Sequence, residues 1–158
     1  MTDGATGRDR PGFAFLLVQL GTHVAAQFAE QIAPLGLEPR HVGMLTRLAA
    51  NEGKAQQAIG DLIGLNPTQT VFLVDELEQR GLVERRRNPA DRRSYSLFLT
   101  EQGRQKLTAV QEAVLTHQNS LASTFTAAER EQLTALLRRL AAEQGLSEQG
   151  LPGIRRRG

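Results

Sequence analysis

The hydropathy pattern of this sequence changes period at Gly81, and no other feature constrains the fold as strongly. Before Gly81, apolar residues recur at three- and four-residue steps, which is typical of amphipathic helices. After it, residues 82–87 and 95–99 follow a period of two, which is typical of strands. The segment between them, Asn88–Asp91, is rich in turn-forming residues. The sequence therefore predicts a β-hairpin within a mainly helical chain.

Two short helices are predicted before the hairpin. The first covers residues 55–63 and ends at a tight turn formed by Gly64 and Leu65. The second begins after Asn66, whose side chain can accept a hydrogen bond from the backbone of Gln69 while Gln69 reaches back in a capping box. Pro67 suits the first helical position, because its missing N–H needs no partner there. Two helices joined by such a turn are typical of a helix-turn-helix.

Longer helices are predicted on both sides of this segment. Residues 13–33 form a helix that Pro34 and Gly36 end, and another helix begins at Pro39. After the hairpin, Thr100 can cap a helix that extends to about residue 123, and residues 126–129 form a capping box that opens the last helix. The apolar stripe of the first helix consists of Phe13, Leu17, Leu20, Val24, Phe28 and Ile32.

Composition excludes several classes of protein. The chain of 158 residues has no cysteine, which excludes disulfides, thiolate metal sites and thiol-based sensing. No apolar run approaches the roughly 20 residues that cross a bilayer, and residues 1–12 lack the apolar core of a signal peptide. We therefore expect a cytoplasmic protein without membrane contact. No glycine-rich phosphate loop, nucleophile–base–acid set or carboxylate pair stands out, so we expect neither an enzyme nor a cofactor.

Positive charge is concentrated in the predicted hairpin. Residues 80–93 contain six arginines and two acids, although the net charge of the chain is only +2. Such a local excess is typical of a phosphate-binding surface, and a solvated charged loop is the plain alternative. The terminal run Arg155–Arg157 lies in a segment that we expect to be a flexible tail and that could add a contact to nucleic acid.

Four segments resemble the multiple-antibiotic-resistance regulator (MarR) family of winged helix-turn-helix transcription factors. They are residues 64–66, residues 73–85, the hairpin tip at 88–93, and residues 97–103 with their Leu-Thr-x-x-Gly pattern. The order of elements is similar from about residue 13 to residue 145. The resemblance implies an obligate homodimer with interlocked N- and C-terminal helices, a winged DNA-binding domain in each subunit, and a pocket for a small ligand where the two regions meet.

The resemblance also implies a division of the chain and a function. We expect a ligand-responsive regulator, more often a repressor, that binds a pseudo-palindromic operator. The expected segments are a disordered tail (1–12), an N-terminal dimerisation helix (13–36), a winged helix-turn-helix domain (37–100), C-terminal dimerisation helices (101–145) and a flexible basic tail (146–158).

The second helix of the helix-turn-helix is the expected recognition helix, which enters the major groove. Its outward side carries Thr68, Gln69 and Phe72. Gln69 can pair with adenine or serve only the cap, and Thr68 can hydrogen-bond to a base or contact a thymine methyl. Phe72 can rest against a thymine methyl or pack beneath the wing. Lys54 and Gln56 are expected phosphate contacts.

In the family, the aspartate at the wing tip and the arginine two positions later act together, and here these are Asp91 and Arg93. The carboxylate can orient the guanidinium toward a narrow minor groove; otherwise the aspartate is an ordinary turn residue. Arg92 is an expected phosphate contact. The three arginines of the first strand alternate around it, so at most two can face DNA. Arg85 and Arg86 are the expected DNA contacts among them.

His23, Arg40 and His41 fall where the family's ligand pocket is lined, and they could meet a phenolic or anionic effector. Ordinary interface or surface roles fit them equally well. The histidines of the chain lack metal-ligand spacing, so no metal site is expected. Two other functions remain compatible with the fold: an architectural DNA-binding protein that is indifferent to sequence, and a winged-helix module that binds a protein partner. The dense arginines of the wing argue against the second.

Overall fold

The computed structural model describes residues 11–89, 91 and 93–146. Most of the two predicted tails, including Arg155–Arg157, and the predicted phosphate contact Arg92 lie outside the described residues. The elements in chain order are α1 (Phe13–Ile32), the 3₁₀ helix η1 (Ala33–Leu35), α2 (Pro39–Ala49), α3 (Gln56–Ile63), α4 (Pro67–Gln79), β1 (Val83–Arg87), β2 (Tyr95–Leu99), α5 (Glu101–Leu121) and α6 (Ala127–Glu143). The prediction of a mainly helical chain with one small hairpin is confirmed.

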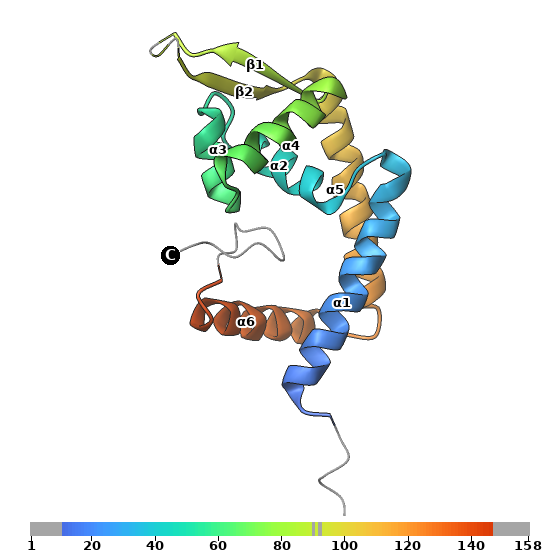
Figure 1. The fold of residues 1–158 in the computed structure, drawn as a ribbon. Coiled ribbons are helices and arrows are strands. Elements are labelled where there is room, and N and C mark those ends of the chain that lie inside the picture. The colour runs from blue at the N-terminus through green and yellow to red at the C-terminus, as the bar shows by residue number, and fades with distance from the viewer. Residues whose placement is uncertain (1–10, 90, 92, 147–158) are drawn as a thin grey trace, which may run out of the picture.

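The elements form two regions along the long axis of the molecule (Figure 1). Helices α2, α3 and α4 pack together beneath the β1–β2 hairpin at one end. Helix α5 leaves this unit and passes beside the C-terminal part of α1, and α6 lies at the opposite end from the hairpin. Among the described residues, no helix is long and apolar enough to cross a membrane.

The hydrophobic core lies almost entirely in the region of the hairpin. Every buried hydrophobic residue of the described chain falls between Ile32 and Val110. Helix α2 contributes Met44, Leu45 and Leu48, which lie three and four residues apart on one face as amphipathic spacing requires. The predicted stripe on α1 is fully buried only at Ile32; Val24 and Phe28 are half-buried, and Phe13, Leu17 and Leu20 are exposed.

Helices α3 and α4 are in close contact at Gly60. A Cβ atom at this position would lie 2.1 Å from Thr70 Oγ1, so only glycine fits. Thr70 Oγ1 donates a hydrogen bond to the carbonyl of Asn66 at 2.9 Å, which fixes its side chain in the contact. Between the helices, Gly64 adopts a left-handed conformation with φ of 79°, which glycine reaches without steric cost. These contacts build the predicted helix-turn-helix.

The Leu-Thr-x-x-Gly pattern has a structural explanation at the start of α5. Thr100 Oγ1 accepts a hydrogen bond from the backbone N–H of Gly103 at 2.9 Å and donates one to the carbonyl of Gly81 at 2.6 Å. A Cβ atom on Gly103 would lie 2.0 Å from the carbonyl oxygen of Leu82. The first turn of α5 therefore packs directly against the backbone that enters β1, and it fixes the base of the hairpin.

Strands β1 and β2 pair antiparallel, with Val83 opposite Leu99 and Arg87 opposite Tyr95. The loop before α3 adds hydrogen bonds along the second edge of β2. The N–H of Leu97 donates to the carbonyl of Lys54 at 3.1 Å, and the carbonyl of Leu97 accepts from the N–H of Gly53 at 2.9 Å. The hairpin is thus anchored to the helix-turn-helix on its inner edge, while its tip extends beyond the helices (Figure 1).

Candidate nucleic-acid interface

The recognition helix α4 begins with the capping box that the sequence predicts. Asn66 Oδ1 accepts from the backbone N–H of Gln69 at 2.8 Å, and Gln69 Oε1 accepts from the backbone N–H of Asn66 at 3.2 Å. Bidentate pairing of Gln69 with adenine needs both its amide oxygen and its amide nitrogen. The cap uses one of the two acceptor positions of this oxygen and fixes its direction, so bidentate pairing in this conformation would have to use the second position. Its contact with DNA stays a prediction.

The outward face of α4 is more apolar than the sequence indicates. Phe72 is 64% exposed, so it does not pack beneath the wing. Val71 is 44% exposed and lies beside it, although its residue type is one normally found in the core. Thr68, one helical turn before Phe72, is also exposed. The exposed surface at the start of α4 therefore combines two apolar side chains, the hydroxyl of Thr68 and the amide of Gln69.

Both edges of α4 are attached to the rest of the domain. On one edge, Asp75 and Glu78 pair with Arg85 of β1, each at 2.5 Å. On the other edge, Glu76 pairs with Arg40 of α2 at 3.2 Å. The buried residues of α4 fill the side that faces the core. The face that remains open carries the residues expected to enter the major groove.

The guanidinium of Arg85 is occupied by partners within the chain. Besides Asp75 and Glu78, its Nε donates to Gln56 Oε1 of α3 at 2.7 Å, and the side chain is only 15% exposed. Arg85 thereby joins β1 to both helices of the helix-turn-helix. The sequence assigned Arg85 and Gln56 to DNA contacts, and those roles stay predictions. In the structure, Arg85 and Gln56 together hold the wing against α3 and α4.

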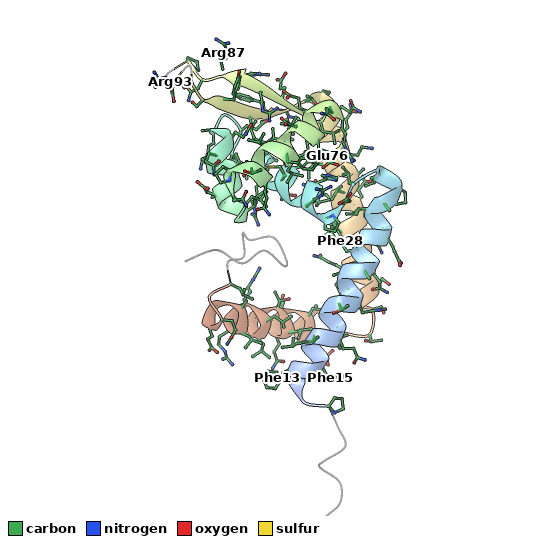
Figure 2. The ribbon with its side chains drawn as sticks, in the orientation of Figure 1. Phe13, Phe15, Phe28, Glu76, Arg87 and Arg93 are labelled. Atoms are coloured by element: carbon green, nitrogen blue, oxygen red, sulfur yellow. The ribbon has the colours of Figure 1, made fainter. Side chains whose placement is uncertain are left out.

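The outward arginines of β1 are Arg86 and Arg87. Arg86 pairs with Glu84, lies 4.2 Å above the centre of the Phe98 ring and keeps 59% of its side chain exposed. Arg87 is exposed near the hairpin tip and was not selected from the sequence (Figure 2). Arg85 is held on the protein side by its three partners, whereas Arg86 and Arg87 are exposed. As neighbours in a strand, Arg86 and Arg87 point to opposite faces, and the predicted DNA contacts of Arg85 and Arg86 stay predictions.

The wing tip is organised through its backbone. Asp91 Oδ1 accepts a hydrogen bond from the backbone N–H of Arg93 at 3.0 Å, and the Asp91 carbonyl accepts from the N–H of Ser94 at 3.0 Å. The expected ion pair between Asp91 and the Arg93 guanidinium is not among the interactions of the described residues. Asp91 instead fixes the turn from which Arg93 extends, and Arg93 is exposed at the tip (Figure 2). Lys54, also predicted to meet phosphate, is exposed near the end of the loop before α3.

A second cluster connects the start of α2 with the C-terminal half of α4. His41 Nδ1 accepts from the backbone N–H of Glu38 at 3.0 Å, which completes a capping box that the sequence analysis missed. His41 Nε2 lies 3.1 Å from Glu76 Oε2, and Arg80 contacts the other Glu76 oxygen at 2.8 Å. The hydrogen bond with His41, together with the nearby positive charges, holds the pKa of the Glu76 carboxyl below its usual value against the opposing effect of burial.

This cluster changes the interpretation of the predicted effector residues. His41 is fully buried, Arg40 pairs with Glu38 and Glu76, and His23 is exposed on α1. The possible ligand atoms of Glu38, His41 and Glu76 lie within 4.8 Å of one another. Two arginines already balance the two carboxylates, so the cluster needs no cation to compensate its charge. An effector role for His23, Arg40 and His41 stays a prediction.

One surface pocket with a volume of about 240 Å³ lies at the junction of α2, β2 and α5. Arg104 and Glu52 form an ion pair at 2.8 Å on its wall. The pocket does not include His23, Arg40 or His41. A separate buried pair, Gln31 on α1 and His117 on α5, lies 3.3 Å apart between Nε2 and Nδ1. Because the two residues lie 86 positions apart in the sequence, no local pattern predicts this contact.

Comparison with known proteins agrees with this geometry. A model of the MarR family matches residues 35–94, which include the helix-turn-helix and most of the hairpin. A transcriptional regulatory protein named for the hcr operon of Thauera aromatica is 36% identical over 115 residues, which cover 72% of this chain and 69% of that protein.

Two solved structures of the transcriptional repressor CouR have the same fold. One, bound to a 23-mer DNA duplex, is 33% identical with a TM-score of 0.75, over 82% of this chain and 92% of that one. The other, CouR from Rhodococcus jostii RHA1 bound to p-coumaroyl-CoA, is 29% identical with a TM-score of 0.67, over 82% and 91%. The chain therefore belongs to the MarR family of winged-helix, DNA-binding transcriptional regulators, and it is not an enzyme.

Proposed function

We propose that this regulator is a homodimeric, ligand-responsive repressor of a pseudo-palindromic operator. Helix α4 enters the major groove, and the β1–β2 hairpin reaches into the neighbouring minor groove through Arg93. One observation carries the proposal: the open face of α4 lies beside a hairpin whose outward side is basic. The exposed residues are Thr68, Val71 and Phe72 on α4 and Arg86, Arg87 and Arg93 on the hairpin.

The dimer is supported by apolar surface that a single chain leaves exposed. Helix α6 has no buried residue, and its Leu133, Leu136 and Leu137 are 42–46% exposed. At the N-terminal end of α1, Phe13 and Phe15 are 73% and 59% exposed (Figure 2). Apolar area of this extent at one end of a soluble protein marks a contact with another molecule. A second copy fits, because two-fold association covers the same patch on both subunits.

A two-fold axis has a consequence for the operator. Two winged domains related by that axis present their α4 helices in opposite directions along the duplex. Half-sites should therefore form an inverted repeat, with centres separated by roughly 10 base pairs or a multiple of that distance. The solved complex of CouR with duplex DNA supports docking through this fold.

Ligand response is supported by CouR, which is described both with DNA and with p-coumaroyl-CoA. The present chain offers a physical route for such coupling. Glu76 of α4 is held by Arg40 and His41 at the start of α2, and Arg80 Nη1 donates to the carbonyl of Gly36 in the turn before α2 at 2.5 Å. A ligand that displaces this turn would change the orientation of α4, and DNA affinity would change with it.

Selection of DNA from a random duplex pool tests the proposal. At about 0.15 M salt, we expect one inverted repeat to be enriched and to bind at least 1,000-fold more tightly than a scrambled duplex, within the range for specific regulators. An architectural binder would retain DNA without enriching a sequence. An interaction module would retain none even at low salt. Either result would contradict the proposal and identify which alternative applies.

A further inference from the structure

The centre of the open face of α4 is apolar, and this property has a consequence for sequence recognition. We propose that Phe72, with Val71 beside it, reads the 5-methyl groups of thymine in the major groove, and that these contacts set the sequence preference more than base hydrogen bonds do. The inference rests on the proposed function, because it requires that α4 enters the major groove.

The position of Phe72 on α4 follows from helix geometry. Successive residues are rotated by about 100°, so Thr68 and Phe72 lie one above the other, one turn apart. Both point away from the buried Thr70, Leu73 and Val74. Val71 lies toward the hairpin edge, where Asp75 and Glu78 pair with Arg85. Phe72 is therefore near the middle of the only side of α4 that no neighbouring element of the described chain holds.

Few polar groups on this face are free to read bases. The amide oxygen of Gln69 is held in the helix cap, and Asp75 is held by Arg85. Thr68 contributes a single hydroxyl. A recognition helix that discriminates mainly by hydrogen bonds needs side chains such as Arg, Asn or Gln with both of their polar groups available. The N-terminal part of the open face of α4 lacks such a set; the exposed Gln79 lies at the C-terminal end of the helix.

The chemistry of the major groove identifies what the phenyl ring can contact. Each base pair presents hydrogen-bonding groups there, and thymine alone among the standard bases also presents a methyl group. A ring placed over a donor or acceptor removes that group from water without pairing it, which is unfavourable. A ring placed over a methyl group buries apolar surface on both sides. The ring therefore favours sites with thymine opposite Phe72.

The surroundings favour DNA over a protein partner as the occupant of this patch. Arg86 and Arg87 are exposed on β1, and Arg93 is exposed at the wing tip. Arg85 balances one of the two negative charges of Asp75 and Glu78 on the hairpin edge of α4, which reduces repulsion of phosphate there. An apolar patch bordered by basic residues is complementary to a groove whose walls are phosphate and whose floor carries methyl groups.

Replacement of thymine by deoxyuridine tests the inference, because it removes only the methyl group. Duplexes selected by the full-length protein are resynthesised with single replacements across each half-site, and affinities are measured by fluorescence anisotropy. We expect a roughly four-fold loss at one or two thymines of each half-site, the value for one buried methyl group. Replacements outside the half-sites serve as controls and should change nothing.

Variants of Phe72 assign the effect to this side chain. Because Phe72 is exposed, Phe72→Ser should leave the fold and the dimer intact, which circular dichroism and sedimentation verify. This variant should bind the thymine and uridine duplexes equally, whereas Phe72→Leu should keep the uridine penalty.

Two results overturn the inference while leaving the proposed function intact: equal affinity of the wild-type protein for all uridine duplexes, or an unchanged uridine penalty in Phe72→Ser. If the selection enriches no sequence, the proposed function fails and this inference fails with it. Binding of a protein to Phe72 without any effect of the variants on DNA affinity would show that the patch serves a different partner.

Discussion

The winged region and the terminal helices of this chain differ in how many of their apolar and charged side chains find partners within one chain. Around α2, α3, α4 and the hairpin, apolar side chains are buried and most charged groups have partners: Arg85 contacts two acids, and Glu76 lies within a cluster of two arginines and a histidine. At the other end, α6 buries no residue, and Leu133, Leu136 and Leu137 are exposed.

This difference indicates where each region obtains its stability. The winged region can fold on the contacts of its own chain, so changes inside it should act on folding or on DNA binding within each subunit. Helix α6 and the N-terminal end of α1 leave apolar side chains exposed within the described chain, so changes there should act on association. The following variants test this separation, beginning with the one expected to have the largest effect.

Gly103→Ala should have the largest effect, because the added Cβ would lie 2.0 Å from the carbonyl oxygen of Leu82, and backbone atoms cannot rotate away. We expect the free energy of unfolding to fall by about 3 kcal/mol, at the upper end for overpacking. Urea denaturation measures this change. Gly12→Ala is a suitable control, since a Cβ there meets nothing within 4 Å. Equal stability of the two variants would contradict the close packing of α5 against the hairpin.

Leu136→Glu should weaken association without unfolding the winged region. Leu136 is 46% exposed in one chain, and its burial against a second copy would contribute about 1 kcal/mol per subunit, to which the cost of burying a carboxylate is added. Sedimentation equilibrium should show monomers at concentrations where the wild-type chain is dimeric. Glu131→Gln on the same helix is the control, and it should stay dimeric. A dimeric Leu136→Glu protein would place the interface elsewhere.

Arg85→Ala should reduce operator affinity roughly ten-fold through loss of wing position, which corresponds to about 1.4 kcal/mol. If Arg85 acts through Asp75 and Glu78, the same substitution should cost much less in a chain that already carries Asp75→Asn and Glu78→Gln. Fluorescence anisotropy across the four chains measures this coupling. A full ten-fold loss in both backgrounds would instead indicate a direct phosphate contact, as the sequence analysis predicted.

The pH dependence of stability should show the smallest effect. The pKa of Glu76 is lowered in the folded chain, mainly by the hydrogen bond with His41, so its charged form stabilises the fold. This contribution is present above the unfolded pKa of about 4.3 and is lost as the pH falls through the lower folded value. Urea unfolding at pH 6 and pH 3 should therefore show a smaller decrease for Glu76→Gln than for the wild-type chain. Identical decreases in the free energy of unfolding would show that Glu76 does not contribute to the loss of stability in acid.

Local features of the fold could be predicted from the sequence, because they depend on neighbours in the chain. The capping boxes at Asn66 and Thr126 form between residues three positions apart, and both are present. The turn at Gly64 and the change of period after Gly81 are equally local. These local signals were sufficient to predict the helix-turn-helix and the hairpin and to show the resemblance to the family.

Features that depend on contacts between distant segments could not be predicted. From the sequence, Arg85 is simply a basic residue in a strand; its ion pair with Asp75 depends on α4 lying beside β1. His41 reads as a surface group, yet Glu76, distant in sequence, encloses it. Val71 reads as a core residue, and only the packing of α4 shows that it is exposed. For the α1 stripe, the helical pattern was correct, but within the described chain Phe13, Leu17 and Leu20 stay exposed.

The assignment of the wing to DNA is tested most directly by the operator affinity of Arg93→Ala as a function of salt concentration. Arg93 is exposed at the wing tip, and its backbone N–H is held by Asp91, so the substitution removes the side chain without disturbing the turn. We expect an affinity loss of roughly ten-fold or more, a salt-dependence slope lower by about one phosphate contact, and an unchanged dimer. An operator affinity and a salt slope equal to those of the wild-type chain would contradict the assignment.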